Sequence, residues 1–394
     1  MKTKQSPQGW KEVKLGNEDY FTILSSGINE FDGEKSYLST ESIKENRIKK
    51  IECKITFSNR PSRANMQPTI NSVWFAKMKD TLKVYSFGNS NKEEINRYTL
   101  STGFAGIKVN EDLVSIKYLE YFLKSHEFNK KKNLLCSGAT QKSINNSNIK
   151  KIKLKLPPKA IQDKIVILLQ KVDKIKQLKE DSNKLTKDYV QKVFFDVFGH
   201  PFSKDKKDKK IKLKEVIRII VPTRDKPKSF TGNIPWVTLP DLNDSIYISD
   251  SKYKLSLDEA KPTKTRLFPK ETVILSCAGS LGKVVIAKKE IFTNQQFYGL
   301  VCDQKKILPE FLACQLKIFG EKYYKGIGGT STLTFFKKDS ALNIEVILPP
   351  LPLQKKFASI VKQVEKLKEY QEQSNQEINN LFNALMQKAF RGEL

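Results

Sequence analysis

The chain has 394 residues, enough for two or three domains that each bury a core. Lys and Arg number 71 against 43 Asp and Glu, and this net charge of +28 predicts a polyanionic partner, either nucleic acid or an acidic membrane surface. The sequence has no long apolar run and no apolar leader, which argues against a membrane span and a secretory signal. Its five cysteines show no CxxC spacing, which argues against a disulfide scaffold, and its two histidines, His126 and His200, are too few for a His-based metal or catalytic site.

The charge is not concentrated in a tail. Residues 1–200 carry a net charge of +15 and residues 201–394 carry +13. Such an even division favours a repeated architecture.

The first globular segment is predicted over residues 1–156. It begins with WKEVKLG from Trp10, has a short apolar helical pattern at 118–125, and reaches a Gly-Thr turn at 137–140. A strand-like run then leads into the pair Pro157 and Pro158, which can precede a helix but not lie inside one.

A long helix is predicted over residues 157–199, ended by Gly199 and Pro201. Its apolar residues recur at alternating steps of four and three, which is typical of a coiled-coil seam. The predicted pairing residues are Ile161, Ile165, Leu168, Val172 and Ile175. The Lys-rich residues 200–210 are predicted to be a linker.

The same order follows again. A second globular segment is predicted over 211–348, with strand patterns at 273–279, 283–289 and 344–350, and an apolar helical stretch at 309–316. A second long helix is predicted over 349–394, ending near Gly392. Its pairing residues are Leu353, Phe357, Ile360, Val364 and Leu367.

The two long helices are copies of one another. LPPKAIQDKIVILLQKVDKIKQLKEDSN at 156–183 and LPPLPLQKKFASIVKQVEKLKEYQEQSN at 348–375 align without a gap at an offset of 192. In both copies the apolar register is broken at the same layer, by Lys179 and Ser182 and by Gln371 and Ser374. A polar layer fixes register at a cost in stability, so we expect antiparallel pairing of the two helices rather than two independent amphipathic helices.

The predicted fold class is therefore α+β: two mixed α/β domains joined and spaced by two long antiparallel coiled-coil helices, with a pseudo-two-fold internal repeat.

With these motifs, the sequence resembles the specificity subunit of type I restriction–modification enzymes. The resemblance is carried by both LPP-x-x-x-Q helices, IPWVTLPDL (234–242), VILSCAGSLGKVVIA (273–287), NQQF (294–297) and QKAFRGEL (387–394). It implies two target recognition domains, each binding one half of a bipartite, asymmetric double-stranded DNA site.

The resemblance also implies partners. The long helices would act as a spacer and dock two DNA-adenine methyltransferase subunits, and restriction/translocase subunits would complete a cytoplasmic complex in a bacterium or archaeon. This chain would be non-catalytic and bind no cofactor, because S-adenosylmethionine, ATP and Mg²⁺ would belong to the partner subunits.

Arg, Asn and Gln can contact base edges with two hydrogen bonds, whereas Lys mainly contacts phosphate. The DNA-binding candidates of the first domain lie in a Pro-containing loop: Arg60, Arg63, Asn65, Gln67 and Asn71. Those of the second domain are Arg224, Lys226, Ser276, Gly279, Ser280, Lys283, Asn294, Gln295 and Gln296. Small residues among them allow the backbone to approach phosphate closely.

The sequence offers weak support for three catalytic alternatives and leaves one non-catalytic alternative open. GSLGKV lacks the G-x-x-x-x-G-K-[ST] spacing of a phosphate-binding loop, and no methyltransferase [DN]-P-P-[YFW] motif is present. A loose nuclease pattern joins Asp241 to Glu259 and Lys261, but Ser256 and Glu259 favour a helix start there. A basic coiled-coil scaffold that binds nucleic acid without sequence preference remains open, although it does not account for two domains of about 150 residues.

Overall fold

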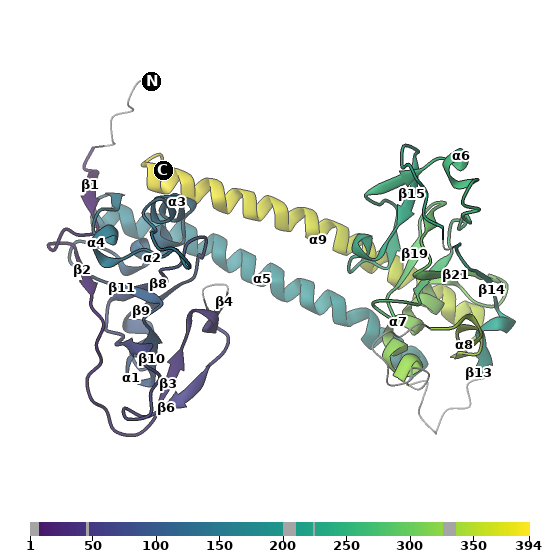
Figure 1. Cartoon of the computed structure of the whole chain (residues 1–394), viewed down its shortest axis with the longest axis horizontal. Coiled ribbons are helices and arrows are strands. Elements are labelled where there is room, and N and C mark those ends of the chain that lie inside the picture. The colour runs from purple at the N-terminus through teal and green to yellow at the C-terminus, as the bar shows by residue number, and fades with distance from the viewer. Residues whose placement is uncertain (1–7, 45–46, 200–209, 224, 326–335) are drawn as a thin grey trace. The chain divides into compact units, whose positions relative to one another are not determined.

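The computed structural model describes residues 8–44, 47–199, 210–223, 225–325 and 336–394, without the side chains of 321–325. They form two compact units: unit 1 comprises Met1–Leu178 and Asn375–Leu394, and unit 2 comprises Lys179–Ser374. The two long helices are α5 (Lys159–Phe198) and α9 (Leu351–Arg391), and each unit contains one half of each (Figure 1). Among the described residues, no helix combines the length and apolarity needed to span a membrane.

Unit 1 contains two four-stranded sheets. The antiparallel sheet has the order β2-β11-β8-β9, with β2 (Phe21–Leu24), β11 (Phe104–Val109), β8 (Ser72–Ala76) and β9 (Val84–Phe87). The other sheet has the order β6-β3-β10-β7, with β6 (Cys53–Ile55), β3 (Lys35–Leu38), β10 (Tyr98–Ser101) and β7 (Ala64–Met66). In it β3 and β10 run parallel.

Shorter elements complete unit 1. They are β1 (Lys11–Lys14) paired with β12 (Lys153–Leu156), β4 (Ile43–Lys44) paired with β5 (Arg47–Ile48), and the helices α1 (Glu94–Arg97), α2 (Ile116–Lys124), α3 (His126–Leu134) and α4 (Asn146–Ile149).

The inner strand β8 explains the layering of unit 1. Its sequence SVWFA is buried on both faces, as expected for a strand between two layers. Val73 and Phe75 pack into the core shared with α2, α5 and α9, while Trp74 packs into a second core with Leu100 and Phe104. The sheet therefore lies between helices on one side and the second sheet on the other.

Unit 2 repeats this plan. Its larger sheet has the order β14-β21-β18-β19-β16, with β14 (Ile217–Ile220), β21 (Phe297–Cys302), β18 (Val273–Ser276), β19 (Val284–Ala287) and β16 (Tyr247–Ile248). The smaller sheet has the order β17-β15-β20, with β17 (Tyr253–Leu255), β15 (Ile234–Val237) and β20 (Phe292–Thr293). The remaining elements are β13 (Lys210–Lys212) paired with β22 (Glu345–Ile347), and the helices α6 (Leu257–Ala260), α7 (Pro309–Lys325) and α8 (Lys338–Leu342).

The alternation of β8 recurs in β18. Val273 and Leu275 pack into the helix-side core, and Ile274 packs into the core on the opposite face. In each unit the opening strand pairs with the strand that ends at the Pro-Pro motif, β1 with β12 and β13 with β22. The predicted fold class is confirmed: mixed α/β units combined with two long helices.

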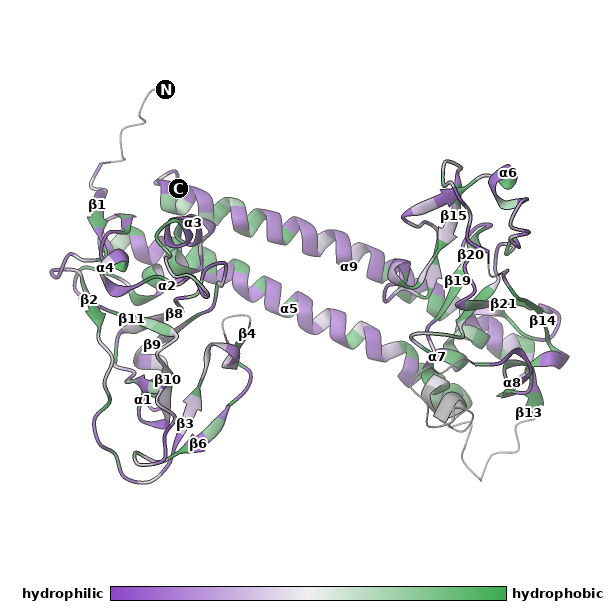
Figure 2. Cartoon of the chain, viewed as in Figure 1, coloured by the Kyte–Doolittle hydropathy of each residue, from purple (hydrophilic) through white to green (hydrophobic). Residues whose placement is uncertain are grey.

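The two long helices have 40 and 41 residues and end at glycines in the left-handed region, Gly199 with φ 67° and Gly392 with φ 73°. A residue with a Cβ atom resists this conformation, so glycine is the favoured terminator. Hydrophobic and hydrophilic residues alternate along both helices (Figure 2).

The buried faces of the helices differ from the predicted seam at several positions. Ile165, Val172, Phe357 and Val364 are buried and Ile161 and Ile360 are half-buried, whereas Leu168, Ile175, Leu353 and Leu367 are 38–48% exposed. Leu169 and Val361 are buried instead, each one position after a predicted seam residue, Leu168 or Ile360. These differences arise because each helix half packs against the core of its unit as well as against the other long helix. The buried face of the helix is therefore wider than the predicted seam and is rotated relative to it.

The LPP-x-x-x-Q motif has a clear structural role, because its glutamine is completely buried in both copies. Gln162 accepts a hydrogen bond from the Ser115 backbone N–H (2.8 Å) and donates to the carbonyls of Leu113 and Pro157 (both 2.9 Å). Gln354 repeats this with the Leu308 N–H and the carbonyls of Lys306 and Pro349, at 2.9, 3.0 and 2.8 Å. Each amide thus joins the start of a long helix to the loop before α2 or α7.

The predicted polar layer is present within unit 2. Gln371, which is 6% exposed, donates from Nε2 to the hydroxyls of Ser182 (3.1 Å) and Thr186 (3.0 Å). Thr186, the next seam position after Ser182 in the heptad register but not among the predicted residues, also donates to the Ser182 carbonyl. Lys179 and Ser374 are half-buried, at the ends of the stretch that forms unit 2.

Candidate nucleic-acid interface

In unit 2 two loops that follow sheet strands lie against each other. The turn between β18 and β19 (277–283) and the segment between β20 and β21 (294–296) are joined by a hydrogen bond from the Cys277 N–H to the Gln296 carbonyl (2.8 Å). A Cβ atom added to Gly279 would lie 3.3 Å from Gln296 Nε2, and Gly279 has φ 77°. Glycine therefore permits both the turn and this close approach.

Several of the predicted residues shape these loops rather than extend from them. Ser276 is buried, donates to the Ser280 carbonyl (2.6 Å) and accepts from the Lys283 N–H (3.0 Å). Asn294 donates from Nδ2 to Gln296 Oε1 (2.9 Å). The exposed members are Gly279, Ser280, Lys283 and Gln295.

The other two candidates of unit 2 stand apart from this pair of loops. Lys226 is exposed in the irregular stretch before β15, and no hydrogen bond or ion pair joins it to the loops among the described residues. Arg224 lies outside the described residues.

In unit 1 the predicted loop places its residues unequally. Arg60 turns back on its own loop: its guanidinium donates to the Phe57 carbonyl and lies 4.1 Å from the centre of the Phe57 ring. Arg63 is exposed, Asn65 is half-buried in β7, and Gln67 is half-buried.

Asn71 occupies a turn position. It is 9% exposed with φ 61°, a conformation that asparagine tolerates better than most residues. Glu271 has φ 67° at a similar place, two residues before β18, while Asn71 directly precedes β8. The buried position and the matched geometry favour a turn role for Asn71 over contact with a base.

This match identifies residues of unit 1 that the sequence did not indicate. If β8 corresponds to β18 and β11 to β21, the counterparts of 277–283 and 294–296 are 77–83 and 101–103. The correspondence is supported by equivalent bonds from the Ile144 N–H to the Lys77 carbonyl and from the Phe336 N–H to the Cys277 carbonyl. The only sequence signal was a Lys-rich turn, KMKDTLK.

These counterpart segments and Arg63 border one cavity of about 570 Å³ in unit 1. Lys77, Thr102 and Gln141 contribute hydrogen-bonding groups to its walls. Burial lowers the pKa of the Lys77 ammonium from its ordinary value. The cavity thus combines cationic and amide groups with the carboxylates of Glu41 and Glu52, a set of groups that can contact phosphate and base edges.

The acidic residues of the loose nuclease pattern, Asp241 and Glu259, cap short helices. At the predicted helix start Glu259 forms a capping box with Ser256, accepting from the Ser256 N–H at 2.8 Å. Asp241 accepts from the Thr238 N–H (2.8 Å). Among the described residues there is no group of three or more His, Cys, Asp or Glu side chains arranged to hold a metal ion. Both carboxylates therefore have structural partners, which accounts for the pattern without catalysis.

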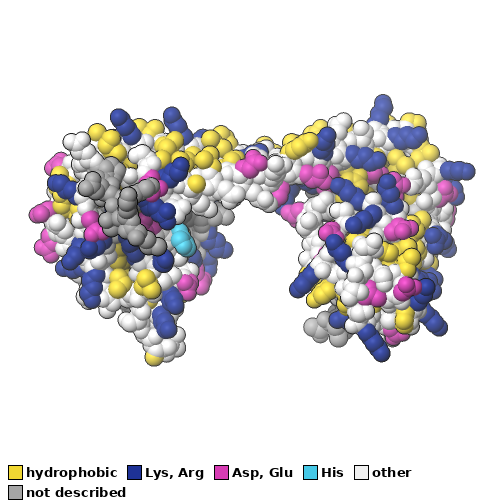
Figure 3. Space-filling model, turned by 90° about the horizontal axis from the view of Figure 1, so that it is seen from above, with side chains coloured by type: hydrophobic (Ala, Val, Ile, Leu, Met, Phe, Trp, Pro, Cys, Tyr) yellow, Lys and Arg dark blue, Asp and Glu magenta, His cyan; other side chains and the backbone are white. Residues whose placement is uncertain are grey.

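Basic side chains are distributed over both units, with acidic side chains between them (Figure 3). This agrees with the similar net charges of the two sequence halves, +15 and +13. A distributed positive surface favours contacts with phosphate that are independent of sequence, so the loops must supply any discrimination between bases.

Comparisons with known proteins agree on one family. A family model described as the type I restriction modification DNA specificity domain matches residues 7–187 and again 206–380. Among curated relatives, the type I restriction enzyme MjaIX specificity subunit of Methanocaldococcus jannaschii is 30% identical over 177 residues, covering 44% of this chain and 41% of the relative. The StySPI specificity subunit of Salmonella potsdam is 25% identical over 319 residues, covering 74% and 68%.

The HindI specificity subunit of Haemophilus influenzae is 28% identical over 146 residues, covering 35% of this chain. The alignments span 41% of the MjaIX relative and 31% of the HindI relative, less than half of each.

Two solved structures share the fold. A chain from a study of complex assembly and conformational transition of the type I R-M system has a TM-score of 0.66 at 20% identity and covers all of both chains. The type I restriction-modification S subunit from M. genitalium has a TM-score of 0.61 at 14% identity, covering 99% of this chain and 98% of that one.

The family model covers most of the chain in two separate matches, each beginning with one globular segment and including most of the long helix that follows it, in agreement with the internal duplication. The chain therefore belongs to the family of type I restriction–modification DNA specificity domains and carries two copies of that domain.

Proposed function

We propose that this chain is the DNA-recognition subunit of a type I restriction–modification complex, and that each unit reads one half of a bipartite, asymmetric site. The observation that carries the proposal is that the specificity domain occurs twice, and that each copy contains its own pair of candidate loops. Because the loops differ between the units while the framework repeats, the two half-sites should differ in sequence.

The interface is proposed to include Arg63, Lys77 and Gln141 in unit 1, and Ser280, Lys283 and Gln295 in unit 2. These side chains border the cavity of unit 1 or are exposed on the paired loops of unit 2. Arg and Gln side chains would contact base edges, and the lysines would neutralise phosphates.

The long helices are proposed to set the spacing of the half-sites and to dock two DNA-adenine methyltransferase subunits, with restriction/translocase subunits joining the complex. Support comes from large apolar side chains exposed along both helices: Ile167, Leu178, Leu185, Tyr189, Tyr370 and Leu381. Exposed apolar side chains grouped on one element are typical of protein-binding surfaces.

In this proposal the chain acts in the cytoplasm and performs no chemistry itself. S-adenosylmethionine, ATP and Mg²⁺ would be bound by the partner subunits. The carboxylates of Asp241 and Glu259 already serve as caps in unit 2, so neither is needed for metal chemistry.

The adenine-methylation pattern of the host genome tests this function. A split motif with two different halves, about one helical turn or 34–36 Å apart, is expected. A continuous palindrome as the only motif that depends on this chain would contradict the proposal.

A competition assay tests sequence preference directly. A labelled target duplex bound by the purified complex should be displaced by unlabelled target, but at least tenfold less well by a scrambled duplex of equal length and composition. Equal displacement by both would instead favour a basic scaffold that binds nucleic acid without sequence preference.

A further inference from the structure

The helical side of unit 2 contains a cavity at a place where the internal repeat positions two aromatic residues in unit 1. It has a volume of about 270 Å³ and lies between α7, the C-terminal half of α5, the N-terminal half of α9 and residues 244–246. Its apolar walls include Val190, Cys314 and Val361, and the carboxylate of Glu365 lies among its lining groups.

The internal repeat identifies the unit 1 residues at the same positions. Along the long helices the offset is 192, so Val190 corresponds to Phe382 and Glu365 corresponds to Asp173. Along α2 and α7 the offset is 193, which the hydrogen bonds of Gln162 and Gln354 confirm, since their partners Ser115 and Leu308 are also 193 apart. Cys314 therefore corresponds to Tyr121.

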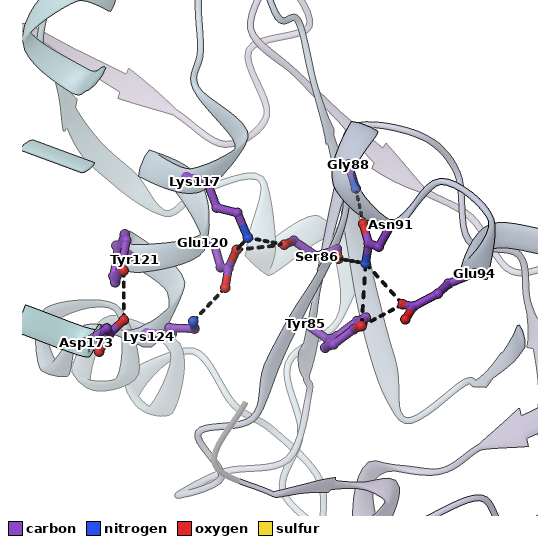
Figure 4. A network of polar contacts seen from close by, with 10 residues as sticks. All are labelled: Tyr85, Ser86, Gly88, Asn91, Glu94, Lys117, Glu120, Tyr121, Lys124 and Asp173. Atoms are coloured by element: carbon purple, nitrogen blue, oxygen red, sulfur yellow. Dashed lines mark hydrogen bonds and ion pairs between the residues drawn. The ribbon is translucent and has the colours of Figure 1, made fainter. Parts of the chain in front are cut away.

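In unit 1 two aromatic rings fill this space. Tyr121 is 4% exposed, and its ring centre lies 6.5 Å from that of Phe382 in an edge-to-face arrangement. The Tyr121 hydroxyl donates a 2.7 Å hydrogen bond to Asp173 (Figure 4). Replacement of Tyr by Cys and of Phe by Val removes both rings from unit 2, which accounts for the cavity.

The charged groups around the rings are retained although the rings are not. In unit 1 the ammonium of Lys124 lies 5.3 Å from the centre of the Tyr121 ring, and that of Lys176 lies 4.7 Å from the centre of the Phe382 ring. Their counterparts Lys317 and Lys368 both line the cavity of unit 2. Ammonium groups at these distances attract the face of an aromatic ring.

The carboxylate that accepts a hydrogen bond is also retained, as Asp173 in unit 1 and Glu365 in unit 2. Glu365 is 4% exposed and accepts from the Ser245 hydroxyl (2.7 Å), the Ile246 N–H (3.0 Å) and Lys368 Nζ (2.6 Å). The two protein O–H and N–H donors use one carboxylate oxygen, Oε2, and Lys368 uses the other. A carboxylate has about four lone-pair positions, so Oε1 can accept another hydrogen bond.

We propose that this cavity of unit 2 is a binding site for a phenolic ring. The ring would occupy the space that Tyr121 and Phe382 fill in unit 1, donate its hydroxyl hydrogen bond to Glu365 and lie between the ammonium groups of Lys317 and Lys368. The volume suits such a ligand, because an apolar cavity of roughly 150 Å³ already accepts benzene.

The ring can come from a free small phenol or from a tyrosine side chain of a bound protein, since both present the same chemistry. The probe is 4-methylphenol, which is the tyrosine side chain as a free molecule. Titration of the full chain, followed by calorimetry or ligand-observed NMR, should show one saturable site with a dissociation constant of roughly millimolar or tighter.

Filling the cavity from within provides the decisive variants. Cys314→Tyr restores the unit 1 residue and should reduce 4-methylphenol binding at least tenfold while raising the melting temperature. Val190→Phe should do the same, and it serves if Cys314→Tyr does not fold. The matched control Cys314→Ser keeps the cavity and should still bind. No saturable binding, or binding that neither filling variant reduces, would overturn the proposal.

The source of the ring is distinguished in the assembled complex, and this step alone depends on the proposed function. Binding of 4-methylphenol to the free chain but not to the chain with its methyltransferase subunits would identify a partner's side chain as the occupant. Binding to both would identify a small phenol. If no such complex forms, the proposed function fails while the free-chain result still tests the site.

Discussion

Gln162 and Gln354 each satisfy three backbone groups that would otherwise be buried without a partner. At each position the side chain provides one acceptor and two donors, a combination that only an amide of this length can supply. The identity of the glutamine in both motifs is thereby explained by hydrogen bonding within the fold, and no contact with DNA is needed to account for it.

Gln162→Ala should lower the free energy of unfolding by about 1–3 kcal/mol, because it leaves buried N–H and C=O groups unpaired. Chemical denaturation of the full chain measures this effect. Gln170→Ala on the same helix is the matched control, since Gln170 is exposed, and it should change stability by less than about 0.5 kcal/mol. Equal effects of the two variants would show that the amide network contributes little.

Glu120 is a second residue whose environment leads to a measurable prediction. It is 7% exposed and accepts hydrogen bonds from Ser86 (2.6 Å), Lys117 (2.7 Å) and Lys124 (2.6 Å) (Figure 4). Burial alone would raise the pKa of this carboxyl group, but the charges and hydrogen bonds of the two lysines outweigh it and lower the pKa to about 2.

A lowered folded-state pKa stabilises the fold above the unfolded value of about 4.3, and the stabilisation is lost as the pH falls toward 2. The two values correspond to about 3 kcal/mol. Glu120→Gln should therefore reduce the dependence of unfolding free energy on pH between 5 and 2. Glu127→Gln, in a more exposed pair with Lys131, is the control and should have an effect below about 1 kcal/mol. An unchanged pH dependence in Glu120→Gln would contradict the assignment.

At the scale of elements, the polar layer can be used to test whether fixing the register of the two long helices lowers the stability of the fold. Gln371→Leu removes a buried amide, and Thr186 retains its hydrogen bond to the Ser182 carbonyl. We expect the variant to be at least as stable as the original chain in chemical denaturation, with unchanged DNA preference. Gln363→Leu at an exposed position of the same helix is the control. Destabilisation by more than about 1 kcal/mol only in Gln371→Leu would mean that the layer contributes net stability.

The two long helices were predictable because local signals define them. The Pro-Pro pairs, the apolar spacing and the terminal glycines are each recognisable from a few neighbouring residues. The helices begin at Lys159 and Leu351 and end beside Gly199 and Gly392. Which face of each long helix is buried was harder to predict. A heptad pattern describes contact with one partner, whereas each helix half also packs on its unit's core, which buries Leu169 and Val361.

The loops of unit 1 were the hardest to interpret from sequence. Asn71 reads as a polar loop residue, and only its positive φ and burial reveal a turn role. Lys77 and Gln141 are 64 positions apart, and only the tertiary fold brings them to one cavity. In unit 2 the sequence indicated the Gly-containing hairpin and the NQQ segment only as separate candidates, and the hydrogen bond from the Cys277 N–H to the Gln296 carbonyl shows that they lie together.

At the scale of the whole molecule, each unit is completed by the far end of the other copy's helix. Met386, Ala389 and Phe390 of α9 are buried in the core of unit 1, while Phe194 and Phe198 of α5 are buried in the core of unit 2. Phe198 and Phe390 are themselves 192 apart. The duplication therefore makes two units whose cores each depend on both long helices.

Independent recognition by two units predicts that a loop substitution affects one half-site. Arg63→Ala should relax discrimination in the half-site read by unit 1, and Gln295→Ala should relax it in the other half-site. Each should cost about 1–3 kcal/mol of preference if the side chain contacts a base with two hydrogen bonds. Binding of the purified complex to a duplex library with each half-site randomised in turn measures both effects, and each variant is the control for the other. Equal weakening on every sequence would assign the side chain to a phosphate, and relaxation of both half-sites by one variant would contradict independent recognition.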